Sequence, residues 1–203
     1  MKKGLLIVVS GPAGSGKGTV NSHLLSTDNF RFSVSATTRA PRPGERDGIN
    51  YFYISRDEFE KKIENGEMLE HNYYCGNYYG TPREAVERVL AEGKNIILEI
   101  DVNGAMQVKK KYPDAVLIML LPPTFSIQEE RLRGRATEDE ETIQKRLAQT
   151  KAEVPHFAEY DYIVYNYDGC ADKAAGDILA IVRAEQLSVS RNPKTADLYF
   201  EKN

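Results

Sequence analysis

The chain has 203 residues, of which 41% are hydrophobic and 28% are charged. This balance excludes a disordered chain, and the length suits one principal domain with insertions. The net charge of -3 argues against a general nucleic-acid surface, and Gly11 interrupts the amino-terminal apolar run too early for a membrane span. Cys75 and Cys170 lie far apart, so we expect no disulfide framework, no zinc site and a reducing cytoplasm as the compartment.

Four apolar segments predict the strands of a parallel sheet. Residues 5–9 form a continuous run rich in β-branched side chains, which suits a strand covered on both faces. The same signature recurs at 95–101 and 115–121 and, in a shorter form, at 162–165. Helical patterns separate these segments, so we expect an α/β fold with a doubly wound parallel sheet.

Two stretches depart from this alternation. Residues 33–88 combine tyrosine-rich alternating pieces, Pro and Gly punctuation and a helix at 56–65, which predicts an inserted mixed α+β lobe. The core of the single domain would then be 1–32 and 89–203. Residues 133–141 are dense in Arg and Glu with few apolar side chains, which predicts a mobile helical lid over about 133–150.

A glycine-rich segment follows the first predicted strand and precedes a helix. It matches Gly-x-x-x-x-Gly-Lys in the setting that this phosphate-binding motif requires. Glycines let backbone N–H groups surround a phosphate, the helix N-terminus adds positive potential and Lys17 adds a point charge. The setting argues against the alternative, an ordinary glycine-rich turn that contains a lysine. The expected binding residues are Gly11, Pro12, Ala13, Gly14, Ser15, Gly16, Lys17, Gly18 and Thr19.

One position departs from the strict motif. Gly18 stands where Ser or Thr normally offers a hydroxyl to a magnesium ion. We therefore assign a contact with phosphate or metal-bound water to Thr19. The Gly-Lys-Gly-Thr ending resembles that of small nucleotide kinases, although the loop alone names no substrate.

The segment 96–101 is an apolar strand that ends in acids. Alternation puts Glu99 and Asp101 on one face, so both could face one cleft, with Asp101 the better candidate to hold a hydrated magnesium ion. The alternative is a solvated strand end that carries capping charges. The phosphate loop nearby favours the functional interpretation.

Arginines on two helical patterns are candidates to stabilise charge during phosphoryl transfer. Arg131 and Arg135 lie four residues apart, and Arg146 lies on the next helix, so a folding lid could bring all three together. The alternative is surface pairing with nearby glutamates, the commoner fate of such residues. We expect this pairing for Arg133 and Lys145.

Two motifs in the inserted lobe resemble those of guanylate kinases. They are Thr-Thr-Arg-x-Pro-Arg-x-Gly-Glu at 37–45 and Gly-Asn-Tyr-Tyr-Gly-Thr at 76–81, and the resemblance runs from about residue 3 to residue 181. It implies a P-loop core with a mobile lid, and transfer of the γ-phosphoryl group of ATP to GMP, and to dGMP as well, with Mg²⁺.

The resemblance also implies roles for the residues that match it. Lys17, Arg39, Arg135 and Arg146 would be catalytic, and Arg131, Arg135 and Asn166 would join the phosphate loop in binding ATP. Arg39, Arg42, Tyr51 and Tyr79 would bind the phosphate of GMP, Ser35, Glu70 and Thr81 would read guanine, and Glu99 and Asp101 would lie near the acceptor nucleoside and the metal. The chemistry agrees, because guanine offers an N1–H and an amine to a carboxylate whereas adenine lacks the N1–H.

Other interpretations remain open for parts of the chain. Tyr53, Tyr73, Tyr74 and Tyr78 are expected to pack rather than bind, as tyrosines in a small lobe usually do. The chain as a whole could be a non-catalytic binding module of the same fold, or an enzyme that acts on AMP or a deoxynucleotide. An intact phosphate loop argues against the first alternative, and Ser35, Glu70 and Thr81 argue for guanine.

Overall fold

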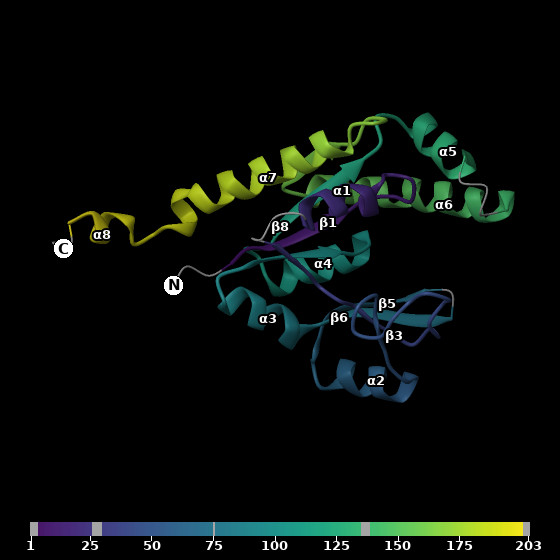
Figure 1. The fold of residues 1–203 in the computed structure, drawn as a ribbon, viewed down its shortest axis with the longest axis horizontal. Coiled ribbons are helices and arrows are strands. Elements are labelled where there is room, and N and C mark those ends of the chain that lie inside the picture. The colour runs from purple at the N-terminus through teal and green to yellow at the C-terminus, as the bar shows by residue number, and fades with distance from the viewer. Residues whose placement is uncertain (1–3, 26–29, 75, 135–138, 201–203) are drawn as a thin grey trace.

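A five-stranded parallel sheet forms the centre of the computed structural model, which describes residues 4–25, 30–74, 76–134 and 139–200 (Figure 1). The strand order is β2-β7-β1-β8-β9, and every neighbouring pair is parallel. The bounds are Leu6–Ser10 (β1), Phe30–Phe32 (β2), Asn95–Glu99 (β7), Val116–Leu121 (β8) and Tyr162–Tyr165 (β9). The predicted doubly wound parallel sheet is confirmed.

Helices cover both faces of this sheet because alternate strand residues supply two separate apolar layers. Helices α1 (Lys17–Leu25) and α7 (Ala171–Leu187) lie on one face, and α3 (Arg83–Ala91) and α4 (Val102–Lys111) lie on the other. The first layer contains Ile7, Val9, Val20, Leu24, Ile97, Ile118, Ile178 and Val182, and the second contains Leu6, Val8, Val86, Leu90, Leu98, Ala105, Val108 and Leu117. Buried apolar contact on both faces stabilises the sheet.

The strand predictions were wrong in two places. The segment predicted as 95–101 is a strand only as far as Glu99, because Asp101 instead caps α4 by accepting a hydrogen bond of 2.8 Å from the Gly104 N–H. Glu99 and Asp101 therefore do not share one strand face. Strand β2 was not predicted, since its three residues are too few to show a period, and it is held by pairing with β7.

A second, mixed sheet belongs to the inserted lobe. Its order is β4-β3-β6-β5, with bounds Ala36–Thr37 (β3), Phe52–Tyr53 (β4), Met68–Tyr74 (β5) and Asn77–Pro82 (β6). Helix α2 (Arg56–Glu64) begins where Ser55 accepts a hydrogen bond from the Glu58 N–H. Phe59 of this helix is fully buried, and its ring stacks on Tyr78 with centroids 5.1 Å apart. The lobe thus has its own small core beneath the sheet.

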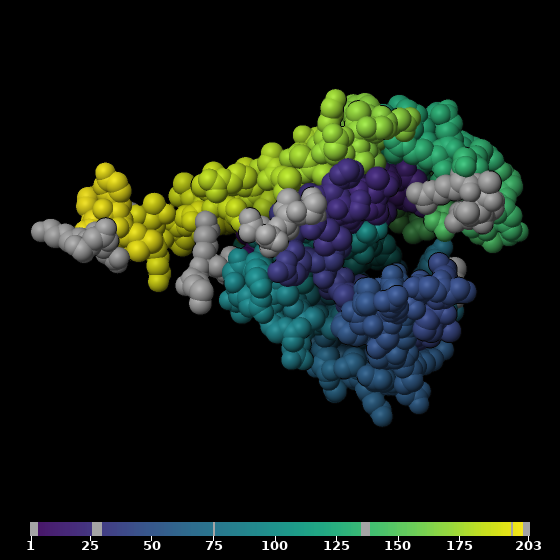
Figure 2. All heavy atoms as spheres, in the orientation of Figure 1, coloured from purple at the N-terminus to yellow at the C-terminus, as the bar shows by residue number. Residues whose placement is uncertain are grey.

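Two further helices lie beside the phosphate loop. Helices α5 (Phe125–Gly134) and α6 (Glu140–Glu153) pack on each other through Leu132, Ile143 and Leu147, with Ala13 against them. Short helices η1 (Val154–Glu159), η2 (Val189–Arg191) and α8 (Thr195–Phe200) complete the described chain, and α8 stands away from the body (Figures 1 and 2). Among the described helices, none has the length and apolar character to cross a membrane.

Because Phe59 fills the centre of the lobe, we expect Phe59→Ala to destabilise the fold by about 3 to 5 kcal/mol, the usual cost of removing a buried phenyl ring. Urea unfolding followed by circular dichroism would measure this loss. Phe200→Ala is the matched control, because Phe200 is 79% exposed on α8 and its loss should change stability by less than about 0.5 kcal/mol. Equal stabilities for the two variants would contradict the described lobe core.

Candidate active site

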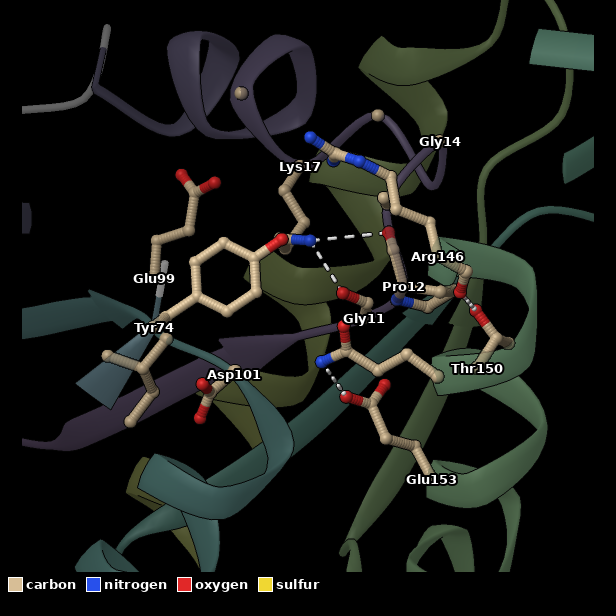
Figure 3. Close-up of a pocket in the computed structure, with 15 residues that line it drawn as sticks. Gly11, Pro12, Gly14, Lys17, Tyr74, Glu99, Asp101, Arg146, Thr150 and Glu153 are labelled. Carbon is tan, nitrogen blue, oxygen red and sulfur yellow. Dashed lines mark hydrogen bonds between the residues drawn. The ribbon is translucent and has the colours of Figure 1, made fainter. Parts of the chain in front are cut away.

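The loop between β1 and α1 has the backbone of an anion cradle. Gly14 and Gly16 adopt φ angles of 88° and 84°, which glycine tolerates without strain. A Cβ on Gly16 would also lie only 2.3 Å from the amide nitrogen of Asn166. Lys17 begins α1, and its Nζ donates to the carbonyl oxygens of Gly11 (2.6 Å) and Pro12 (3.3 Å) (Figure 3). A lysine and a helix N-terminus therefore meet at one point, as an anion requires.

A cavity of about 540 Å³ opens in front of this loop. Figure 3 shows that side chains from the loop, the end of β7, β5 of the lobe and α6 face one another across it. The lining residues are Gly11, Pro12, Ala13, Gly14, Gly16, Lys17, Gly18, Tyr74, Glu99, Ile100, Asp101, Arg146, Gln149, Thr150 and Glu153. Most of the loop residues, Lys17, Arg146 and both acids predicted from the sequence therefore lie around the same space.

Arg131 and Asn166 lie behind the loop rather than in the cavity. Asn166 is 5% exposed and donates from Nδ2 to the Ser15 carbonyl at 2.9 Å. Arg131 donates to the Gly14 carbonyl at 3.3 Å and the Asn166 carbonyl at 2.7 Å, and pairs with Asp168 at 2.6 Å. These bonds satisfy the Gly14 and Ser15 carbonyls of the loop. Ser15 itself is buried and is not one of the residues that line the cavity. The geometry gives Arg131 and Asn166 a role in shaping the cradle.

Other predicted positions have different outcomes. Thr19 is exposed on α1 and is not one of the residues that line the cavity. Gly18 lines the cavity, and a Cβ built on it would meet nothing within 4 Å. Arg135 lies outside the described residues. Arg133 pairs with Glu129 and Glu140, and Lys145 pairs with Glu141 at 2.7 Å, so the expected surface pairing of these two cations is confirmed.

The two acids after β7 are held by amides. Glu99 accepts a hydrogen bond of 2.7 Å from Asn21 of α1. Asp101 accepts one of 2.5 Å from Asn72 of β5, in addition to the bond from Gly104 by which it caps α4. Within the described ranges, no cluster of three or more His, Cys, Asp or Glu side chains could hold a metal ion. The carboxylates of Glu99 and Asp101 line the cavity, and one or two carboxylates are what a magnesium ion takes when phosphates and water supply its other ligands.

A cationic cluster lies in the lobe around Arg39. Its guanidinium lies over the Tyr51 ring at 5.6 Å, and the Tyr51 and Tyr79 rings contact edge to face at 6.0 Å. Burial lowers the pKa of Arg39, but hydrogen bonds with Glu45 and Tyr79 outweigh burial and the net shift is upward. Three of the four residues predicted to bind a phosphate are thus in contact, whereas the Arg42 side chain is exposed beside them.

Glu45 is the anion of this cluster, and sequence reasoning gave it no role. Its carboxylate accepts from Arg39 (3.0 Å), the Arg42 N–H (2.7 Å) and the Tyr53 hydroxyl (2.8 Å). The Arg42 N–H, then Tyr53 and Arg39, hold the pKa of Glu45 below its ordinary value. Tyr53 was expected to pack only, so this bond adds a polar function to it. The six-residue spacing from Arg39 to Glu45 within one motif was the available signal.

A second polar group lies deeper in the lobe. Glu70 on β5 is 4% exposed. One of its carboxylate oxygens accepts a hydrogen bond of 2.6 Å from the hydroxyl of Thr81, the residue that pairs with it on β6. Burial raises the pKa of Glu70 to about 7; the Thr81 hydroxyl opposes this shift and the Asp101 charge adds to it. Ser35 directly precedes β3, an inner strand of the same sheet, and its carbonyl accepts a hydrogen bond of 2.8 Å from the Phe52 N–H. The structure thus pairs two of the three predicted base-reading side chains.

The cavity also contains groups that the sequence did not reveal. Tyr74, expected to pack, is half-exposed at the end of β5 and faces the phosphate loop (Figure 3). Glu153 of α6 accepts a hydrogen bond of 2.9 Å from Gln149. Burial raises the pKa of Glu153, although the nearby Lys17 charge acts to lower it. Relative to Arg146, the residues Gln149, Thr150 and Glu153 stand at i+3, i+4 and i+7, and this spacing along one helix face was the available signal.

The fold and the cavity together define a class of protein. A phosphate loop on a doubly wound sheet, with an inserted lobe that faces it, is the architecture of a P-loop phosphotransferase acting on small molecules. The sequence model of the guanylate kinase family matches residues 3–185. The chain belongs to the guanylate kinase family.

Individual relatives agree with this assignment. A guanylate kinase of Halalkalibacterium halodurans is 51% identical over 191 residues, which span 94% of this chain and 93% of the relative. A guanylate kinase of Escherichia coli is 46% identical, with coverage of 100% and 98%. The crystal structure of guanylate kinase from Anaplasma phagocytophilum superposes with a TM-score of 0.75 at 35% identity, with coverage of 94% and 90%.

The raised pKa of Glu70 predicts how stability depends on pH. Folding favours the protonated carboxyl, so its contribution is fully present below about pH 4.5, the ordinary pKa, and is lost as the pH rises through about 7. We expect the wild-type chain to lose on the order of 2 to 3 kcal/mol relative to Glu70→Gln between these limits. Urea unfolding at several pH values would measure the difference, with Glu64→Gln on the exposed side of α2 as the control substitution. A difference that does not change with pH would contradict the burial argument.

Proposed function

We propose that this chain transfers the γ-phosphoryl group of ATP to GMP, and to dGMP, giving ADP and the corresponding diphosphate. The observation that carries the proposal is that the cavity in front of the phosphate loop contains Lys17 together with Arg146, Glu99 and Asp101. The phosphate loop with Lys17 supplies a donor side, and the buried Glu70–Thr81 pair supplies a base-reading side. Asp101 lines the cavity in front of the loop, and its charge helps to raise the pKa of Glu70, so this residue lies between the proposed donor and base-reading sides.

On the donor side, the loop would hold the β- and γ-phosphates of ATP. Lys17 donates to loop carbonyls in the structure, and we propose that its ammonium turns to phosphate oxygens, where its charge stabilises the transferring group. Arg146 extends from α6 into the cavity and would add a second cation (Figure 3). Arg131 and Asn166 would act indirectly by fixing the loop, and Arg135 remains the candidate for a further cation from the lid.

On the acceptor side, the phosphate of GMP would bind Arg39, Arg42, Tyr51 and Tyr79. Arg39 is already oriented by Glu45, Tyr79 and the Tyr51 ring, so little side-chain entropy would be lost when the phosphate arrives. Glu70 and Thr81, with Ser35 before β3, would hydrogen-bond to guanine. A site built on buried hydrogen bonds rejects a base that leaves them unpaired by roughly 10⁴-fold.

Magnesium completes the proposal. When bound, it would neutralise charge on the donor phosphates. Asp101 is the side chain in the cavity best placed to hold it through water, with Glu99 beside it, and Thr19 is the weaker candidate because it lies outside the cavity. The proposal has three further parts. Residues 133–150 would move as a lid, residues 33–88 would form the acceptor lobe, and the chain would act in the cytoplasm.

The alternative of a non-catalytic binding module requires a site without catalytic groups. Lys17, Arg146, Glu99 and Asp101 all line the cavity, and such a set has no evident use in a scaffold. The alternative of an AMP kinase conflicts with Glu70, because adenine has no N1–H to donate to it. Phosphorylation of GMP is therefore the function that the site supports best.

Removal of the Lys17 ammonium tests the proposal directly. We expect Lys17→Ala to lower kcat by at least about 100-fold, since one preorganised electrostatic contact to a transition state contributes this much. A coupled assay of ADP release would measure the loss. Lys173→Ala on the exposed side of α7 is the matched control and should keep full activity. Wild-type turnover in a folded Lys17→Ala variant would refute the assigned donor site.

A further inference from the structure

Helix α4 is fastened along strand β5 by side chains that bond the strand's polar groups. Asp101 at its start accepts from Asn72, and Lys111 at its end donates to the carbonyls of Met68 (3.2 Å) and Leu69 (2.7 Å). Between them, Gln107 donates to the His71 carbonyl at 2.8 Å and accepts from the His71 N–H at 3.2 Å. These contacts fix both the distance and the register of α4 on β5.

Gly104 lies within this contact, opposite the Glu70 side chain. A Cβ built on Gly104 would lie 2.7 Å from Glu70 Oε2 and 3.2 Å from Glu70 Cδ. The other carboxylate oxygen, Oε1, is bound to Thr81 at 2.6 Å. The carboxylate is thus held on one side by a hydrogen bond and on the other by the bare backbone of a glycine.

The glycine is not required by the helix itself. Its φ is not in the left-handed region, and alanine is the better helix former. Its N–H bond to Asp101 would be kept by alanine, because the backbone donor does not change. The close approach to Glu70 is therefore the feature that a side chain at this position would disturb.

We propose that Gly104 is a specificity-determining residue that positions the Glu70 carboxylate for guanine. It acts through Glu70 and touches no reacting atom, so it is a positioning residue, and the inference rests on the proposed function of Glu70 in reading the base. Because the α4 and β5 contacts hold the helix in place, a methyl group at position 104 displaces the carboxylate more easily than the helix. The displaced carboxylate then fails to accept both the N1–H and the 2-amino group of guanine.

The test compares Gly104→Ala with wild type on two acceptors, GMP and inosine monophosphate. Hypoxanthine keeps the N1–H and O6 of guanine but lacks the 2-amino group, so the ratio of kcat/KM for the two acceptors reports the second hydrogen bond. We expect Gly104→Ala to lower this ratio by about 10-fold, the value of one hydrogen bond to a charged group, mainly through a higher KM for GMP. The KM for ATP should stay within about twofold of the wild-type value, because the substitution weakens the binding of the acceptor and not that of ATP.

Gly176→Ala is the matched control. Gly176 also lies within a helix, α7, but nothing lies within 4 Å of a Cβ built on it, so this substitution should leave both kcat/KM values unchanged. The double variant Glu70→Ala/Gly104→Ala provides the coupling test. Without the carboxylate there is nothing to displace, so Gly104→Ala should have no further effect on the ratio in the Glu70→Ala background.

The outcomes separate this inference from the proposed function. If Glu70→Ala lowers the ratio and Gly104→Ala does not, Glu70 reads guanine but Gly104 does not position it. If Glu70→Ala itself leaves the ratio unchanged, the proposed base-reading function of Glu70 fails first. An equal loss on both acceptors, repeated in the Glu70→Ala background, would show that Gly104 acts on the helix and would overturn the proposal.

Discussion

The packing of α4 between the parallel sheet and β5 is the constraint on which the rest of the structure depends. Ala105 and Val108 of this helix share an apolar layer with Leu98 and Leu117 of the sheet and with Leu69 of the lobe. The same helix begins at Asp101, which lines the cavity, and passes Glu70 at Gly104. Helix α4 thus contacts both the cavity and the Glu70–Thr81 pair, and the proposed transfer needs the donor and the acceptor held at a fixed distance.

The cations of the site are held by internal partners in the structure. Arg39 is bound by Glu45, Lys17 by the carbonyls of its own loop and Arg131 by Asp168. Such bonds keep long side chains oriented and avoid unpaired charge in partly buried places. Phosphate groups would replace the loop carbonyls as partners of Lys17 and would join the hydrogen bonds of Arg39. Nucleotide binding would therefore change the partners of these side chains more than it would restrict their conformations. This arrangement favours the proposed electrostatic stabilisation of the transferring phosphoryl group.

The sequence was sufficient for features that depend on local pattern. Apolar runs identified β1, β7, β8 and β9, and the loop from Gly11 to Lys17 lies at the predicted turn. Features that depend on tertiary contact were not accessible. Asp101 caps α4 instead of continuing β7. Asn166 donates a hydrogen bond to the Ser15 carbonyl, 151 residues away along the chain. The approach of Gly104 to Glu70 likewise depends on how a core helix meets a lobe strand, which no local spacing records.

The central claim is that the cleft transfers a phosphoryl group specifically to a guanine nucleotide. The most direct measurement is ADP release by the wild-type chain with ATP, Mg²⁺ and, in separate reactions, GMP, AMP or UMP. The account predicts turnover with GMP and a kcat/KM for AMP and UMP that is lower by roughly 10⁴-fold. Comparable turnover with AMP or UMP would contradict the function assigned to Glu70, and no turnover with any acceptor would contradict the proposed kinase activity.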